Sequence, residues 1–191
     1  MSPLFCKPRP GAGTLYSQYE PCIQRTISFR GLQMKSDLPM IHEWTSKEYA
    51  VDYWQMNGPF SQLYAIYQCM EYNPYAHSFI GLMDNVVICQ YDVYNILADE
   101  LKGHIDAAPD DCGFHLLMSP NEKPIPGLTR IIVRSFLAYY FSFTKATRMY
   151  AEPDINNHKS IVLLEACGFK KIKTVDMSYK TAHVYCIESR L

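Results

Sequence analysis

The order of segments in this 191-residue chain predicts an α/β fold in which one mixed sheet carries helices on its faces. Two observations support this prediction. Two apolar runs joined by the short polar connection 83–85 are typical of an antiparallel hairpin. A strand–helix–strand unit spans residues 112–151, and its right-handed crossover would place two strands parallel in the same sheet. The sheet is therefore expected to contain both kinds of pairing.

Apolar runs bounded by turn residues predict the strands. We expect strands at 27–32, 78–82, 86–94, 112–118, 147–151, 169–178 and 182–189. The strands at 112–118 and 147–151 form the parallel pair, so their C-terminal ends should lie at the same edge of the sheet. Open α/β sheets bind their ligands at that edge.

Apolar residues at helical spacing, together with capping residues, predict the helices. We expect N-caps at Asp37, at Ser61, and at Asn156 or Asn157. Residues 73–74, an Asn-Pro pair, end the helix that follows Ser61. A strongly amphipathic helix covers residues 128–143, and the last helix ends at Gly168, where a C-terminal glycine is favoured.

Length and composition favour one domain with a short appendage. Residues 1–25 hold four Pro and two Gly without an apolar pattern, which predicts an irregular N-terminal arm before a single domain at 26–191. Hydrophobic residues make up 48% of the chain, which excludes a disordered protein. The formal net charge of −1 provides no electrostatic footprint for nucleic acid or for an anionic membrane.

The seven cysteines are an odd number, and none forms a C-x-x-C pair, so we expect free thiols in a reducing compartment. The N-terminal residues contain no apolar signal segment, and no window approaches about 18 uninterrupted apolar residues. These features predict a cytoplasmic protein. The His and Cys residues show no metal-ligand spacing, so no metal cofactor is expected.

Three stretches of sequence carry a family resemblance. They are EPDINNHKSIVLLEACGF at 152–169, D-x-C-G-F-H-L-L-M-S-P at 110–120 and I-H-E-W at 41–44. Together they resemble the GCN5-related N-acetyltransferase superfamily and, within it, the acyltransferases of hydroxamate siderophore biosynthesis, which serve iron acquisition. The resemblance covers about residues 27–185.

The resemblance implies a mostly antiparallel sheet whose central parallel strand pair is splayed to admit acyl-CoA. It also implies transfer of an acetyl, succinyl or longer acyl group from acyl-CoA to an N-hydroxylated lysine or diamine. The expected partner is thus a small-molecule acceptor, with the protein a monomer or a homodimer. Backbone N–H groups at the splay would polarise the thioester carbonyl.

His115 and Asp154 are the candidate catalytic residues. His115 shares its strand face with Gly113 and Leu117, and imidazole has a pKa suited to a general base near neutrality. The alternative is a core histidine bonded to a carbonyl. Asp154 follows the neighbouring parallel strand and, by the resemblance, would orient His115 or bind the N-hydroxyl of the substrate. The alternative for Asp154 is a solvated turn residue.

The resemblance and the start of the helix near residue 127 suggest the residues that bind acyl-CoA, because helix N-termini bind phosphates. We expect contacts from Leu117, Met118, Lys123, Gly127, Leu128, Asn157 and Ser160. The glycine-rich phosphate loop of the superfamily is absent, since residues 121–127 hold one Gly and two Pro. Many superfamily members protonate the departing thiolate with a Tyr in the last helix, where this sequence has Leu164. Arg130 and Arg134 would either pair with phosphates or form a solvated basic face.

Segments that line the acceptor cleft in the family contain candidate substrate-binding residues. These are Trp44, Trp54, Tyr91 and Asp92, of which Asp92 would meet a cationic amine. Aromatic residues in such segments are also common in cores. Two other functions remain open: an ordinary amine or amino-sugar N-acetyltransferase, and a non-catalytic acyl-CoA-binding sensor that kept the fold.

Overall fold

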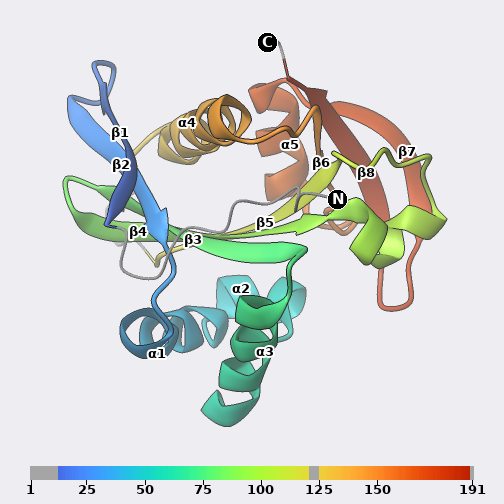
Figure 1. The fold of residues 1–191 in the computed structure, drawn as a ribbon, viewed down its shortest axis with the longest axis horizontal. Helices are drawn as coiled ribbons and strands as arrows, with labels where there is room; N and C mark the ends of the chain where they lie inside the picture. The colour runs from blue at the N-terminus through green and yellow to red at the C-terminus, as the bar shows by residue number, and fades with distance from the viewer. Residues whose placement is uncertain (1–12, 121–124, 190–191) are drawn as a thin grey trace.

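The computed structural model describes residues 13–120 and 125–189. Within these residues, eight strands form a single sheet in the order β1-β2-β3-β4-β5-β6-β8-β7 (Figure 1). The strands are β1 (Thr14–Glu20), β2 (Arg25–Gly31), β3 (Ala76–Met83), β4 (Val86–Asn95), β5 (Cys112–Met118), β6 (Arg148–Ala151), β7 (Lys170–Asp176) and β8 (Thr181–Glu188). β5 and β6 pair in parallel and the other neighbours pair antiparallel, which confirms the predicted fold class.

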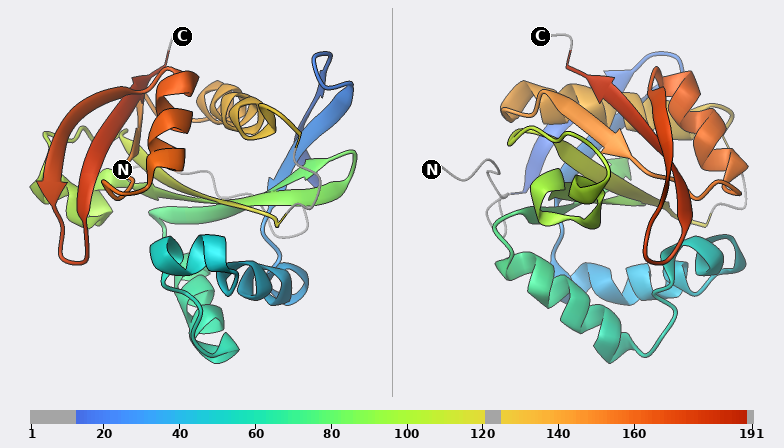
Figure 2. Two further views of the ribbon diagram at one scale, coloured as in Figure 1. Left: turned by 180° about the vertical axis from the view of Figure 1, so that it is seen from behind. Right: turned by 90° about the vertical axis from the view of Figure 1, so that its right-hand side faces the viewer.

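Helices cover both faces of the sheet, as Figures 1 and 2 show. One face carries α1 (Met34–Thr45), α2 (Glu48–Trp54) and α3 (Phe60–Tyr72), and the other carries α4 (Leu128–Phe143) and α5 (His158–Cys167). Two short 3₁₀ helices, η1 (Ile96–Ala98) and η2 (Glu100–Gly103), follow β4. Because successive strand residues point to opposite faces, central strands such as β3 and β5 contribute to separate cores on the two faces.

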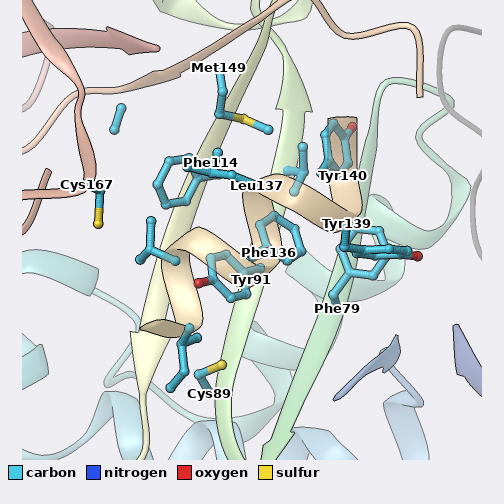
Figure 3. Packing of buried hydrophobic residues seen from close by; sticks show 14 of the residues in the cluster. Phe79, Cys89, Tyr91, Phe114, Phe136, Leu137, Tyr139, Tyr140, Met149 and Cys167 are labelled. Carbon is cyan, nitrogen blue, oxygen red and sulfur yellow. The ribbon is translucent and has the colours of Figure 1, made fainter. Parts of the chain in front are cut away.

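The larger core lies between the sheet and α4. Phe136 of α4 stacks on Tyr91 of β4, with ring centroids 3.9 Å apart and planes 6° apart (Figure 3). Tyr139 and Phe79 pack beside them. The predicted apolar stripe of α4 therefore faces the sheet. The second core places Ile80 and Leu117 of the sheet against α1 and α3.

The start of α1 depends on a buried ion pair. The Asp37 carboxylate accepts two hydrogen bonds from Arg30, at 2.7 and 2.8 Å, and a third from the backbone N–H of Gln33 at 2.7 Å. Such a bidentate pair fixes both side chains. It ties the first turn of α1 to β2.

Two predicted caps are wrong. Asp37 lies inside α1 instead of preceding it, because its carboxylate reaches back to the N–H of Gln33, the actual N-cap residue. Ser61 is likewise inside α3, whose N-cap is Pro59. Asn157 does cap α5, with its side-chain oxygen accepting from the N–H of Ser160 at 3.1 Å.

The prediction of an irregular arm at 1–25 is wrong for residues 14–20, which form β1. This strand pairs with β2, and its Tyr16 stacks on Phe29 at 5.8 Å, so cross-strand packing orders it. The Pro residues that suggested an arm lie mostly before residue 13, outside the described residues. The helix α2 was also missed, because seven residues are too few to display a helical period.

The parallel pair separates soon after it forms. β5 and β6 pair at Cys112 with Met149 and at Gly113 with Tyr150. β5 then continues to Met118, whereas β6 ends at Ala151. Beyond Gly113, the edge of β5 that faces β6 therefore has no strand partner in the described part of the chain.

Gly113 permits a close approach between β5 and a side chain of β4. A Cβ on Gly113 would overlap the ring of Tyr94, whose hydroxyl donates to Glu152 Oε2 at 2.8 Å. The absence of a side chain at Gly113 therefore lets Tyr94 lie across β5 and reach the residue that follows β6.

Replacing Gly113 with alanine should displace Tyr94 and break its hydrogen bond to Glu152. We expect the free energy of unfolding to fall by about 1–3 kcal/mol, the usual cost of overpacking. Urea denaturation measures the change. Gly103→Ala is the control, since a Cβ at Gly103 meets no atom within 4 Å. Equal stabilities of the two variants would contradict the packing described here.

Candidate active site

A histidine–glutamate pair lies where β5 and β6 separate. His115 Nε2 lies 2.8 Å from Glu152 Oε1, and the side chain of His115 is 43% exposed whereas that of Glu152 is 2% exposed. His115 belongs to β5, and Glu152 is the first residue after β6. The splay of the parallel pair thus places a partly exposed imidazole against a buried carboxylate.

The Glu152 carboxylate has further partners from other strands. Tyr94 of β4 donates its hydroxyl to Oε2 at 2.8 Å. Lys180, in the connection between β7 and β8, donates Nζ to the backbone oxygen of Glu152 at 2.6 Å and lies 3.8 Å from Oε1. Buried carboxylates require such partners, because leaving the charge unpaired away from water is costly.

The charges of this cluster shift its proton affinities. Burial lowers the pKa of His115, but Glu152 and, more weakly, Asp92 outweigh burial, so the pKa lies above the ordinary value near 6.5. Burial raises the pKa of Glu152, yet His115, Lys180 and Tyr94 hold it at about 2. Glu152 therefore stays ionised throughout the range in which His115 titrates.

A second buried carboxyl group lies opposite His115 in the sheet. Asp92 of β4 is the cross-strand partner of His115 and is 2% exposed. It accepts hydrogen bonds from Ser78 at 2.5 Å, from Tyr67 at 3.1 Å and from Gln90. Burial raises the pKa of Asp92 and these hydrogen bonds lower it, and the effect of burial is the larger, so the pKa lies above its ordinary value. The imidazole thus has one carboxyl group on each side.

Two aromatic rings lie beside His115. Trp54, at the end of α2, meets its ring edge-on at 6.1 Å, and the ring of Tyr94 lies 5.1 Å away. Tyr49, also on α2, donates its hydroxyl to the carbonyl of Met118 at 2.6 Å. The helix α2, which the sequence did not reveal, therefore borders the splayed end of β5.

A pocket of about 510 Å³ lies past the end of β5. It is lined by Lys47, Glu48, Tyr49, Pro120 and Lys159. These residues come from the start of α2, from the chain after β5 and from the start of α5. Neither His115 nor Glu152 lines the pocket, but Tyr49 connects it to the carbonyl end of β5.

His115 forms its hydrogen bond with Glu152 and not with Asp154. The Asp154 carboxylate accepts from the backbone N–H of Asn156 at 2.8 Å, within the turn before α5. The prediction that Asp154 orients His115 is therefore corrected. Its alternative role, contact with the N-hydroxyl of a substrate, stays a prediction.

The predicted acceptor residues separate into two groups. Trp54 lies beside His115, and its contact with a substrate stays a prediction. Trp44 and Tyr91 are buried in the two cores, so their rings are not available to a substrate. Asp92 lies inside β4 instead of at its end and is occupied by three donors. Helical or strand spacing alone does not distinguish such core residues from cleft residues.

The predicted acyl-CoA residues occupy several environments. Gly127 adopts φ +76° as the N-cap residue of α4, a conformation that favours glycine. Asn157 and Ser160 form the cap of α5, and Met118 is half-buried at the end of β5. The side chains of Leu117 and Leu128 are buried in cores, so at these two positions the backbone alone is available. Lys123 lies outside the described residues.

Several features of this cluster were missed by the sequence analysis. Glu152 is the first residue of the quoted stretch 152–169 but was given no role, although a glutamate directly after a buried strand is a recognisable signal. Tyr94 and Lys180 carry no local signal, because the sheet order brings them to Glu152 from distant segments. Leu164, where many superfamily members have Tyr, is buried in the core beneath α5.

The described residues were predicted to hold free thiols and no metal ligands. They contain no group of three or more His, Cys, Asp or Glu side chains able to hold a metal ion. Six cysteines there are free thiols, as predicted, and Cys6 lies outside the described residues. The helices among these residues are all too short or too polar to span a membrane.

Three relatives match most of this chain. The N(6)-hydroxylysine O-acetyltransferase of Escherichia coli is 25% identical over 178 residues, which are 93% of this chain and 56% of the relative. The N-hydroxyputrescine acetyltransferase of Acinetobacter baumannii is 25% identical over 167 residues, 85% of this chain and 77% of the relative. A relative from Schizosaccharomyces pombe is 27% identical, and this chain covers 53% of it. The chain thus spans about half the length of the relatives from E. coli and S. pombe.

Solved structures share the fold. An uncharacterized protein of Bacillus halodurans superimposes with a TM-score of 0.85 and 24% identity, covering 91% of this chain and 89% of that protein. An aminoglycoside acetyltransferase in complex with coenzyme A gives a TM-score of 0.75 and 20% identity, covering 85% and 94%. At these identities the likeness establishes the architecture.

The family model described as the acetyltransferase (GNAT) domain matches residues 33–177. This range contains α1 through β7 and holds both His115 and Glu152. The superfamily resemblance predicted from the motifs is confirmed. The chain belongs to the family of acetyltransferase (GNAT) domains.

Proposed function

We propose that this chain transfers an acyl group from acyl-CoA to the nitrogen of an N-hydroxylated amine. The observation that carries the proposal is the His115–Glu152 pair at the splayed end of β5 and β6. The names of the relatives from E. coli and A. baumannii support the acceptor class, since one concerns hydroxylysine and the other hydroxyputrescine. The product would be a hydroxamate, as siderophore biosynthesis requires.

The reaction requires attack by the acceptor nitrogen and departure of the CoA thiolate. The acceptor nitrogen attacks the thioester carbon and forms the new C–N bond, and the nitrogen loses its proton. The C–S bond then breaks, and CoA leaves as a thiolate. A hydroxylamine nitrogen is largely unprotonated at neutral pH, so its lone pair is available and the demand on a base is mild.

His115 has the geometry of the base. With Nε2 held against the Glu152 carboxylate, a neutral ring carries its proton on Nε2 and its lone pair on Nδ1. His115 Nδ1 makes no hydrogen bond in the part of the chain that the structure describes. This nitrogen would accept the acceptor's proton, and Glu152 would stabilise the imidazolium that forms.

The splayed edge of β5 would bind the acyl donor. Past Gly113 its backbone has no partner from β6, so N–H groups there are available to a thioester carbonyl or to the pantetheine arm. Gly127 at the start of α4 and Asn157 at the start of α5 would flank the donor. No described group is assigned to protonating the thiolate, because the side chain at Leu164 is aliphatic and water would serve.

A second function is favoured by one observation. The aminoglycoside acetyltransferase shares the fold, so an ordinary amine is the alternative acceptor. A non-catalytic acyl-CoA sensor is the third reading. Measurements on the acceptor and on His115 separate the three.

His115→Ala should lower turnover by on the order of 10²–10⁴, the usual contribution of a general base. Binding of acyl-CoA, measured by calorimetry, should change little, because the proposed role of His115 concerns the acceptor's proton. A variant with near-normal turnover would return His115 to a structural role, and a wild-type protein that binds acyl-CoA without turnover would support the sensor.

Glu152→Gln should lower kcat and move the pH dependence of kcat/KM to lower pH. The neutral form of His115 is the active one, so activity rises as pH increases through its raised pKa. Without the Glu152 charge, burial dominates and that pKa falls. Asp154→Asn is the matched control, since it removes a carboxylate two residues away, and its pH profile should stay in place. Identical profiles for Glu152→Gln and wild type would contradict the proposed pairing.

Assays with acetyl-CoA or succinyl-CoA should show much higher kcat/KM on N-hydroxylysine or an N-hydroxydiamine than on the parent amine. Product formation is measured by mass spectrometry, which also identifies the acylated nitrogen. Equal rates on both acceptors would instead favour the ordinary amine N-acetyltransferase.

A further inference from the structure

The connection between β7 and β8 brings a lysine to the His115–Glu152 pair. Lys180 Nζ donates to the backbone oxygen of Glu152 at 2.6 Å and lies 3.8 Å from Glu152 Oε1. Its side chain is 16% exposed. Most lysines keep their ammonium group in water, so a largely buried lysine side chain whose ammonium group contacts Glu152 is unusual.

The same connection is anchored on both sides. Glu100 of η2 accepts hydrogen bonds from the backbone N–H and the hydroxyl of Ser178, at 2.7 and 2.8 Å. On the other side, the N–H of His183 donates to the carbonyl of Pro153 at 3.0 Å, so the start of β8 runs beside the segment that follows Glu152. Lys180 is therefore held in place by the fold around it.

Several charged or titratable groups act on His115. β4 contributes Asp92 and Tyr94, the residue after β6 is Glu152, and Asp99 follows η1. α2 meets the ring with the uncharged Trp54. Among the groups that shift the proton affinity of His115, the carboxyl groups favour the imidazolium and Lys180 opposes it.

This balance matters for a base. An ionised Glu152 with no competing cation would hold the proton on His115, and the imidazolium has no lone pair with which to accept another. A second cation on the same carboxylate weakens that hold, while the hydrogen bond from Nζ fixes the backbone of Glu152.

We propose that Lys180 is a positioning residue for His115, because its ammonium group fixes the carbonyl of Glu152 and shares the Glu152 carboxylate with the imidazole. His115 then gives up its proton more readily than the Glu152–His115 pair alone would allow. The inference rests on the proposed role of His115 as the base, and it adds a residue from the C-terminal hairpin to the site.

Lys180→Gln tests the charge while keeping a donor for the Glu152 carbonyl. The pKa of His115, measured by NMR titration of its ring protons, should rise by roughly 0.5–1 unit. The acidic limb of kcat/KM should move by the same amount, which means roughly a 3–10-fold lower value on that limb and little change at its high-pH plateau. Lys180→Arg keeps the positive charge, so the pKa of His115 and the acidic limb of kcat/KM should lie close to their wild-type values.

Lys173→Met is the matched control, since it removes an exposed positive charge from β7 of the same hairpin and should shift neither curve. An unchanged pKa of His115 in Lys180→Gln would overturn the proposal. So would an equal loss of activity at every pH, because that pattern indicates structural support alone. The NMR titration needs no turnover, so it stays decisive even if His115→Ala shows that His115 is not the base.

Discussion

The buried charge of Glu152 is the constraint around which this end of the molecule is arranged. A carboxylate this far from water must be paired, and its partners come from separate elements: Tyr94 from β4, His115 from β5 and Lys180 from the last hairpin. Each contact requires a particular feature of the fold. Tyr94 reaches across because position 113 is glycine, and His115 is exposed because β6 stops while β5 continues.

Much of the architecture could be predicted from local patterns. The hairpin of β3 and β4, the parallel pair and the apolar stripe of α4 each follow from spacing within one segment or from a chirality rule. The missing elements are those whose order comes from packing: β1, which Phe29 of β2 stabilises through Tyr16, and the short helix α2. The sequence of β1 lacks a regular apolar alternation, and the seven residues of α2 are too few to display a helical period.

Only part of the candidate site could be predicted, because contacts between distant segments leave no local sequence pattern. His115 lies where β5 and β6 separate, yet the carboxylate that contacts it is Glu152 and not Asp154. The two residues are two positions apart, and the turn geometry decides between them, since Asp154 is occupied by the N–H of Asn156. Tyr91 and Asp92 illustrate the alternation of a strand: one ring lies under α4, while the next side chain lies on the face of α3.

The contacts that complete the site join distant parts of the chain. Tyr94, His115 and Lys180 lie 58, 37 and 28 positions from Glu152. Contacts of such sequence separation form slowly, because the entropy of closing long loops is lost before the contacts are gained. The cluster around Glu152 therefore has no counterpart in any isolated segment. The complete cluster exists only in the finished sheet, where β8 pairs with β6 and the preceding connection brings Lys180 to Glu152.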